Sequence, residues 1–130
     1  MNKSAIIKSI QAQLPEALAI YAFGSQIHGT NTSSSDLDLA VLVPGYTDPL
    51  ALWQLANQLA NQLELEVDLL DFRAASTIMQ NQILHTGERW WHLDSQADAY
   101  EAAVLSEMTN LNAARGKLLA TIAESGTIYE

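Results

Sequence analysis

The chain has 130 residues, 48% of them hydrophobic, and its 15 acidic and six basic residues give a formal net charge of −9. This length fits one domain with a single hydrophobic core, and the hydrophobic content excludes a wholly disordered chain. The basic residues are scattered and form no stripe of the kind that holds a nucleic-acid backbone, so no direct DNA or RNA substrate is expected.

Membrane and disulfide-bonded proteins are excluded on similar grounds. No apolar run approaches the roughly 20 residues that span a bilayer, and the first residues lack the apolar core of a signal peptide. The chain contains no cysteine, which excludes disulfides and thiolate metal sites. We therefore expect a cytoplasmic protein without a membrane segment, whose acidic surface suits solubility or a basic protein partner.

Apolar periodicity and turn residues predict an alternation of helices and strands. In chain order, the expected elements are a helix over 5–14, a strand over 18–23, a short helix over 25–29, a strand over 36–43, a helix over 49–63, a strand over 65–70, a helix over 73–84, an edge strand over 89–93 and a helix over 95–125. This order predicts a single α/β (α+β) domain over 1–130, a mixed β-sheet flanked by helices.

The last helix is expected to be long, because 95–125 contains no proline and only one interior glycine, Gly116. An apolar stripe runs along it, made of Tyr100, Val104, Met108, Leu111, Leu118 and Ile122. Two interpretations stay open. The stripe either packs on the sheet of its own chain or docks a partner protein.

The most informative segment of the chain is GSQIHGTNTSSSDLDLAVLV, which begins at Gly24. Gly24 follows a buried strand and lets a phosphate approach the backbone, because it has no Cβ. Ser25 offers a hydroxyl and a backbone amide at the start of a short helix, where unpaired N–H groups attract anions. The alternative interpretation is an ordinary strand-to-helix turn with Ser25 as its N-cap.

Two carboxylates follow this turn. Side chains alternate along a strand, so Asp36 and Asp38 share one face while the apolar residues beside them point to the other. Two like charges beside a buried strand are costly, and a divalent cation such as Mg²⁺ removes that cost. The alternative is a polar loop in which Asp36 accepts hydrogen bonds from turn amides.

A third carboxylate is expected from the next strand, LEVDLLD, which offers Glu66, Asp68 and Asp71. Glu66 lies near the start of the strand, while Asp71 has the opposite parity and is placed to cap the helix expected after it. We therefore select Asp68 to bind metal or to accept a proton from an attacking group. The alternative for Asp68 is a polar residue on a half-exposed edge strand.

With these residues in place, the chain resembles a nucleotidyltransferase of the DNA-polymerase-β-like superfamily. More narrowly, it resembles the MntA-type branch of the minimal nucleotidyltransferases (MNT). The pattern GS-x10-DxD runs from Gly24-Ser25 to Asp36 and Asp38, and the resemblance covers 18–70. One departure is the turn GSQIHG, in which relatives often carry arginines, as in GSRARG.

The resemblance implies an ATP- and Mg²⁺-dependent enzyme in which Asp36, Asp38 and Asp68 are catalytic and bind the metal, while Gly24 and Ser25 bind the nucleotide. It implies an antitoxin that transfers AMP from ATP to a tyrosine hydroxyl of a partner HEPN ribonuclease toxin, within a heteromeric complex. Two alternatives stay open: a non-catalytic antitoxin that acts by binding alone, and a small-molecule nucleotidyltransferase of the aminoglycoside-modifying type.

Overall fold

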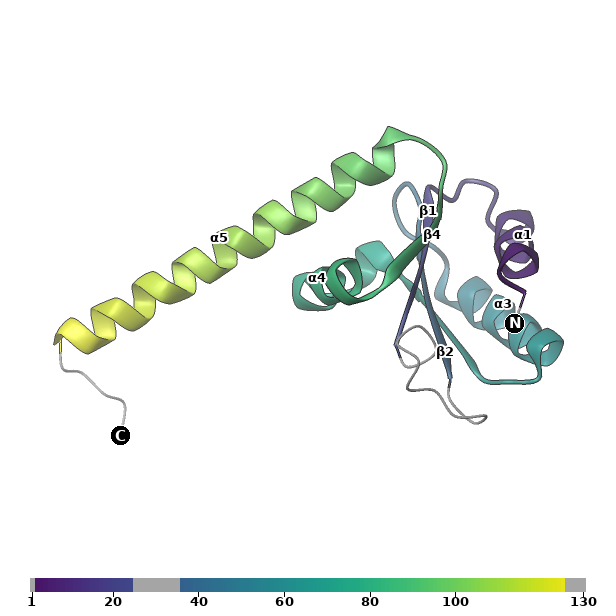
Figure 1. Cartoon of the computed structure of the whole chain (residues 1–130), viewed down its shortest axis with the longest axis horizontal. Coiled ribbons are helices and arrows are strands. Elements are labelled where there is room, and N and C mark those ends of the chain that lie inside the picture. Colours follow the sequence, from purple (N-terminus) through teal and green to yellow (C-terminus); the bar gives the residue numbers. More distant parts are fainter. Residues whose placement is uncertain (1, 25–35, 126–130) are drawn as a thin grey trace.

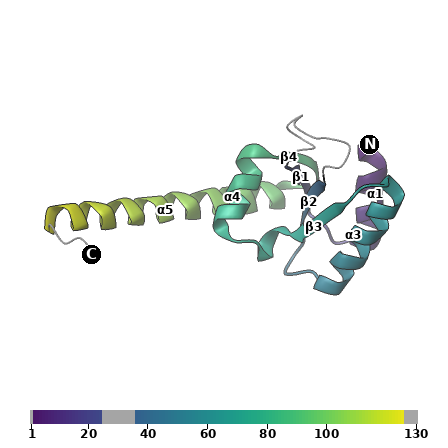
Figure 2. The ribbon, with the colours of Figure 1, turned by 90° about the horizontal axis from the view of Figure 1, so that it is seen from below.

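The computed structural model describes residues 2–24 and 36–125, with side chains as far as Lys117. Its elements are α1 (Lys3–Gln13), β1 (Ala19–Phe23), β2 (Leu37–Leu42), α3 (Pro49–Leu63), β3 (Val67–Asp71), the 3₁₀ turn η1 (Phe72–Ala74), α4 (Thr77–Thr86), β4 (Glu88–His92) and α5 (Ser95–Ser125). Figures 1 and 2 show a sheet with helices on both faces and a long final helix, which confirms the predicted architecture. The short helix expected over 25–29 lies outside the described residues.

The four strands form one mixed sheet in the order β3-β2-β1-β4. β1 is antiparallel to both of its neighbours, whereas β2 and β3 are parallel and are joined by α3. Parallel strands need such a crossover, because the chain must return to the same end of the sheet. The register places Asp38 of β2 opposite Phe23 of β1 and opposite Asp68 of β3.

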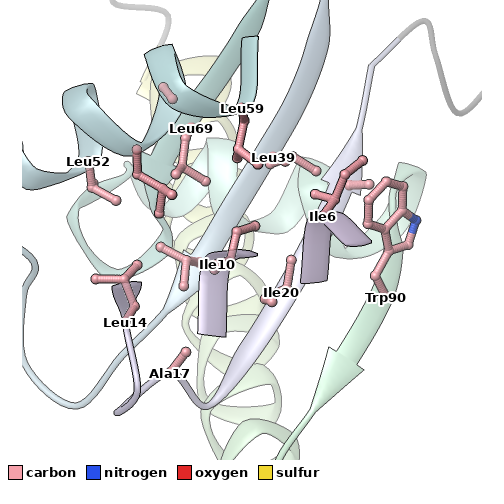
Figure 3. Packing of buried hydrophobic residues seen from close by; sticks show 14 of the residues in the cluster. Ile6, Ile10, Leu14, Ala17, Ile20, Leu39, Leu52, Leu59, Leu69 and Trp90 are labelled. Carbon is pink, nitrogen blue, oxygen red and sulfur yellow. The ribbon is translucent and has the colours of Figure 1, made fainter. Parts of the chain in front are cut away.

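Helices α1 and α3 cover one face of the sheet, and α4 and α5 lie on the other (Figures 1 and 2). On the first face, Ile6 and Ile10 of α1 meet strand residues such as Ile20 and Leu39, all 1% exposed or less (Figure 3). On the second face, Tyr21 and other buried side chains form a separate apolar cluster. Both faces of β2 are therefore covered, which fits its nearly continuous apolar sequence.

Local capping explains the helix boundaries. Asp48 accepts a hydrogen bond from the Leu50 N–H at the start of α3, as its position before Pro49 predicts. The expected single helix over 73–84 was wrong: η1 ends at Ala74 and α4 begins after Ser76, whose hydroxyl accepts from the Met79 N–H. A serine N-cap therefore divides this segment in two.

The long helix α5 packs on α4 and on the sheet with its N-terminal part. Ala97 and Val104 are buried and Tyr100 is partly buried, whereas Leu111 is 39% exposed and the described side chains after it are exposed. In Figure 1 the rest of the helix projects away from the sheet. The first interpretation of the stripe is thus confirmed for its N-terminal part, and the side chains of Leu118 and Ile122 lie outside the described set.

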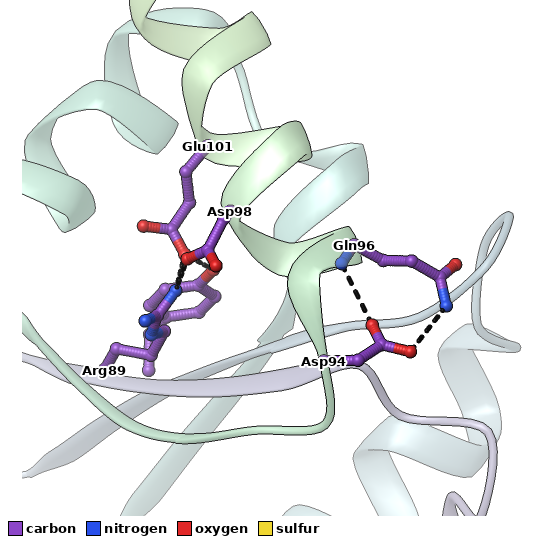
Figure 4. A network of polar contacts seen from close by, with 6 residues as sticks. Arg89, Asp94, Gln96, Asp98 and Glu101 are labelled. Atoms are coloured by element: carbon purple, nitrogen blue, oxygen red, sulfur yellow. Dashed lines mark hydrogen bonds and ion pairs between the residues drawn. The ribbon is translucent and has the colours of Figure 1, made fainter.

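A polar network attaches α5 to the sheet (Figure 4). The Arg89 guanidinium of β4 forms ion pairs of 2.7 Å with Asp98 and with Glu101. Glu101 also accepts a 2.9 Å hydrogen bond from the hydroxyl of Tyr21, which is buried in β1. Across the described segments, no helix combines the length and apolar character needed to cross a bilayer.

Candidate active site

The predicted site residues that the structure describes gather at one end of the sheet. Gly24 follows the last residue of β1, Asp36 precedes β2, and Asp68 is the second residue of β3. β1 ends where β2 and β3 begin, because β1 is antiparallel to β2 and β2 is parallel to β3. Three strands that are separate in the sequence thus contribute to one site. Ser25 lies outside the described residues.

Gly24 lies directly against the Asp38 carboxylate. Its φ of +83° is a conformation that residues with a Cβ rarely adopt. A Cβ added there would collide with Oδ2 of Asp38 and would lie 3.2 Å from its Cγ. Glycine is therefore required twice at this position, for the backbone conformation and for the space.

Asp38 lies at the centre of the cluster of three carboxylates, Asp36, Asp38 and Asp68. Burial raises its pKa above the ordinary 3.8, and the negative charges of Asp68 and Asp36 raise it further. The carboxylates of Asp36 and Asp68 are thus close enough to Asp38 to disfavour its ionisation. The sheet pairs Asp38 directly with Phe23 and with Asp68. The side chains of these three paired residues therefore lie on the face that α4 and α5 cover.

The structure also distinguishes the three acidic residues considered for the third carboxylate. Asp71 is 9% exposed and accepts hydrogen bonds from the Thr47 N–H, the Thr47 hydroxyl and the Arg73 N–H, at 2.9, 3.1 and 3.0 Å. It therefore has a structural role at the far end of β3. Glu66 precedes β3 and is exposed, whereas Asp68 lies beside Asp38.

These residues suit a hard cation by their chemistry. Mg²⁺ prefers oxygen ligands, is bound by one or two carboxylates in many enzymes, and keeps waters and substrate phosphates as its other ligands. In the described ranges no group of three or more histidine, cysteine or carboxylate side chains converges as a complete metal centre. The mutual repulsion around Asp38 is nevertheless what a bound cation relieves, so the donor set fits Mg²⁺.

Sequence reasoning gave Gly24 only one reason to be glycine, the approach of a phosphate. The structure adds the contact with Asp38, which follows from the antiparallel pairing of β1 and β2. Pairing of the two apolar strands on either side of the polar loop was the signal that could have revealed it. Gln26 and His28 of the turn lie outside the described residues.

A mixed sheet that carries a glycine turn and strand-borne carboxylates at one end is the arrangement of a nucleotidyltransferase. The family described as polymerase beta, nucleotidyltransferase matches residues 5–96, so the chain belongs to this family. The protein adenylyltransferase MntA of Shewanella oneidensis strain MR-1 is 34% identical over 119 residues, which are 92% of this chain and 86% of that protein.

Solved structures agree with this assignment. A crystal structure of a toxin–antitoxin with AMP-PNP contains a chain with a TM-score of 0.83 and 33% identity, and the match covers 95% of this chain and 99% of that one. A second structure holds a tri-AMPylated Shewanella oneidensis HEPN toxin in complex with MNT antitoxin. Its matching chain has a TM-score of 0.74 and 31% identity, with 93% of this chain and 95% of that chain covered.

Proposed function

We propose that this chain is an antitoxin-type protein adenylyltransferase that moves AMP from ATP to a tyrosine hydroxyl of a partner HEPN ribonuclease toxin. The observation that carries the proposal is the cluster of carboxylates around Asp38, in a chain that matches MntA over most of its length. Asp38 itself packs against Gly24. The chain is similar to chains from toxin–antitoxin structures, including one with AMP-PNP and one with a tri-AMPylated toxin. This similarity supports a HEPN toxin as the acceptor and ATP as the nucleotide. Because the proposed reaction consumes ATP, we expect it to take place in the cytoplasm.

In this proposal Asp36, Asp38 and Asp68 hold Mg²⁺. When bound, Mg²⁺ supplies positive charge that neutralises the phosphates of ATP. Gly24 leaves room beside the backbone for the Asp38 carboxylate. The turn of Gly24 and Ser25 binds the triphosphate, and Ser25 contributes its hydroxyl and amide. Fixed strands hold the carboxylates, so the reaction depends mainly on positioning and on charge neutralisation.

The chemical step is a displacement at the α-phosphorus. The tyrosine oxygen of the toxin forms a bond to this phosphorus while the bond from phosphorus to the bridging oxygen of pyrophosphate breaks. Asp68 accepts the proton of the tyrosine hydroxyl, because its carboxylate is exposed and lies beside Asp38 in the register of the sheet. Pyrophosphate leaves with the electron pair of the broken bond.

The test combines the chain with a candidate HEPN toxin, sought in the adjacent reading frame, together with ATP and Mg²⁺, followed by intact mass spectrometry of the toxin. We expect the toxin to gain the mass of one or more AMP units. The double variant Asp36→Asn plus Asp38→Asn should lower this transfer by at least about a thousandfold, since it removes two of the three carboxylates assigned to the metal. The matched control is Glu66→Gln, at an exposed carboxylate that precedes β3, and it should keep wild-type transfer.

Two results would overturn the proposal in favour of its alternatives. A double variant that binds and neutralises the toxin as well as wild type would show an antitoxin that acts by binding alone. AMP transfer to an aminoglycoside with an unmodified toxin would show a small-molecule nucleotidyltransferase.

A further inference from the structure

A cavity lies at the opposite end of the sheet from the candidate active site. Its volume is about 530 Å³, within the range of pockets that hold small organic molecules. Leu18, before β1, and Leu42, the last residue of β2, line its base. Ala99, Tyr100 and Ala103 form its wall on α5, and Arg73 after β3 completes it. Its lining is thus mainly apolar with one cationic group.

The Arg73 guanidinium lies near two tyrosine rings and forms no hydrogen bond with the described residues. Its central carbon lies over the ring of Tyr100 at 4.9 Å and over that of Tyr46 at 5.8 Å. Aromatic rings interact with the faces of a guanidinium, whereas its N–H bonds point outward in its plane. The Nε atom is buried without a hydrogen-bond partner among the described residues. Nε is too buried to contact a ligand, so the terminal Nη atoms, which form no hydrogen bond with the described residues, are the donors left for an acceptor.

The nearby acidic residues do not supply that acceptor. Asp71 uses both carboxylate oxygens on the Thr47 N–H and hydroxyl and on the backbone N–H of Arg73 itself. Asp94, at the start of α5, accepts from the backbone and side-chain amides of Gln96 (Figure 4). In the part of the chain that the structure describes, no carboxylate forms an ion pair with Arg73.

We propose that this cavity binds a carboxylate attached to a small apolar or aromatic body. The flat guanidinium of Arg73 matches a carboxylate with two parallel N–H···O bonds, which a lysine could not provide. The body of the ligand lies against Leu18, Leu42 and the two alanines of α5. Such a group belongs either to a free organic acid or to an acidic side chain of a protein partner, and the experiment separates these two sources.

The test titrates the full-length ¹⁵N-labelled chain with benzoate and, in parallel, with benzamide, its uncharged analogue of the same shape. We expect saturable shifts of the Gly45 and Ala99 amides with benzoate, and binding of benzamide at least about tenfold weaker, because its amide cannot replace the charge-assisted pair. Arg73→Gln should lose the preference for benzoate. Arg115→Gln, on the exposed part of α5, is the matched control and should bind benzoate as wild type does.

A second variant keeps the test decisive if Arg73→Gln disturbs the fold. This variant is Ala99→Leu, at an exposed position of α5 where a helix tolerates leucine well. The leucine side chain fills the cavity while Arg73 stays intact. It should also abolish the benzoate shifts. Equal binding of benzoate and benzamide, wild-type benzoate binding by both cavity variants, or no saturable shift at all would each overturn the proposal.

The source of the carboxylate follows from repeating the titration in the complex with the HEPN toxin. If a toxin side chain occupies the cavity, the complex excludes benzoate and Arg73→Gln weakens the complex at least about tenfold. If the ligand is a free organic acid, benzoate binds the complex and the isolated chain alike. This arm alone rests on the proposed function, and failure of toxin binding leaves the titration of the isolated chain valid.

Discussion

Gly24 and Asp38 constrain each other at the level of single atoms. The glycine has no Cβ because the carboxylate occupies that volume, and the carboxylate is confined because backbone lies against it. An acidic side chain with its conformation already restricted loses less entropy when it binds a ligand. This contact therefore prepares the site before any nucleotide arrives.

Replacing Gly24 by alanine tests this contact. We expect AMP transfer to fall at least about a hundredfold and stability to fall by about 1–3 kcal/mol, from the steric clash and the positive φ. Gly45→Ala is the matched control, because Gly45 has a φ of +81° but open space where its Cβ would lie. It should share the backbone strain and keep its activity, as measured by toxin mass and urea unfolding. Equal loss of activity in both variants would contradict the role of the contact.

Asp38→Asn is expected to stabilise the metal-free protein at neutral pH. The folded-state pKa of Asp38 lies above its ordinary 3.8, so the folded state binds a proton more readily than the unfolded chain does. This group therefore favours folding as the pH falls through the raised pKa and opposes it at neutral pH. After allowance for solvent screening, we expect a gain on the order of 1 kcal/mol, or a few degrees in Tm.

Thermal melts with and without Mg²⁺ provide the measurement. Mg²⁺ should raise the Tm of the wild type and should have less effect on Asp38→Asn, because the variant lacks a ligand. An equal Mg²⁺ shift in both proteins would argue that the ion binds elsewhere.

At the level of elements, the sequence predicted those helices and strands that local sequence patterns determine. The strand at 36–43 was predicted from its apolar run, and α3 from Asp48 and Pro49 at its start. The strand expected at 65–70 begins only at Val67, because the Leu65 N–H still donates to the Ala60 carbonyl at the end of α3. Such competition between neighbouring elements is invisible to a periodicity count.

The residues of the candidate site were proposed from the sequence, whereas the contacts between them depend on the fold. The spacing of Gly24, Asp36 and Asp38 suggested phosphate and metal chemistry, but strand pairing alone brings Gly24 against Asp38 and Asp68 beside it. Arg73 was assigned only to a helix start, because its tyrosine neighbours come from distant segments. Long-range partners of this kind depend on the register of the sheet.

The attachment of α5 to the sheet depends on Tyr21, whose hydroxyl donates to Glu101. Burial raises the pKa of Tyr21, and the hydrogen bond to Glu101 raises it further, so the hydroxyl stays protonated. Tyr21→Phe should cost about 1–2 kcal/mol in urea unfolding, since it removes a hydrogen bond to a charged group. Tyr46→Phe, at a ring that is 71% exposed, should change stability by less than about 0.5 kcal/mol. Equal effects would place the strength of this attachment elsewhere.

The whole molecule has two unequal parts, a packed sheet domain and the projecting part of α5 (Figures 1 and 2). The described side chains from 109 to 117 are exposed, and contacts with the sheet domain concentrate in the first turns of the helix. The projecting part therefore adds surface without adding to the core.

Ending the chain after Thr109 should leave the sheet domain folded. We expect the free energy of unfolding to change by less than about 1 kcal/mol, because the described side chains that are lost contribute little burial. Ending the chain after Ala99 should cost several times more, since it removes Glu101 and the buried Val104. Urea unfolding followed by tryptophan fluorescence compares the two, and a large loss in the longer variant would contradict this division.

The burial pattern of β2 has a consequence for mutational tolerance. Within Leu37–Leu42 every side chain except Asp38 is buried. In a saturation scan of this strand, most substitutions at the five apolar positions should reduce the amount of folded protein in the cell. Substitutions of Asp38 by residues of similar or smaller size, such as asparagine, should leave abundance unchanged or higher while toxin protection disappears. Within this one strand, the five apolar positions are thus under selection for folding, whereas Asp38 is under selection for activity.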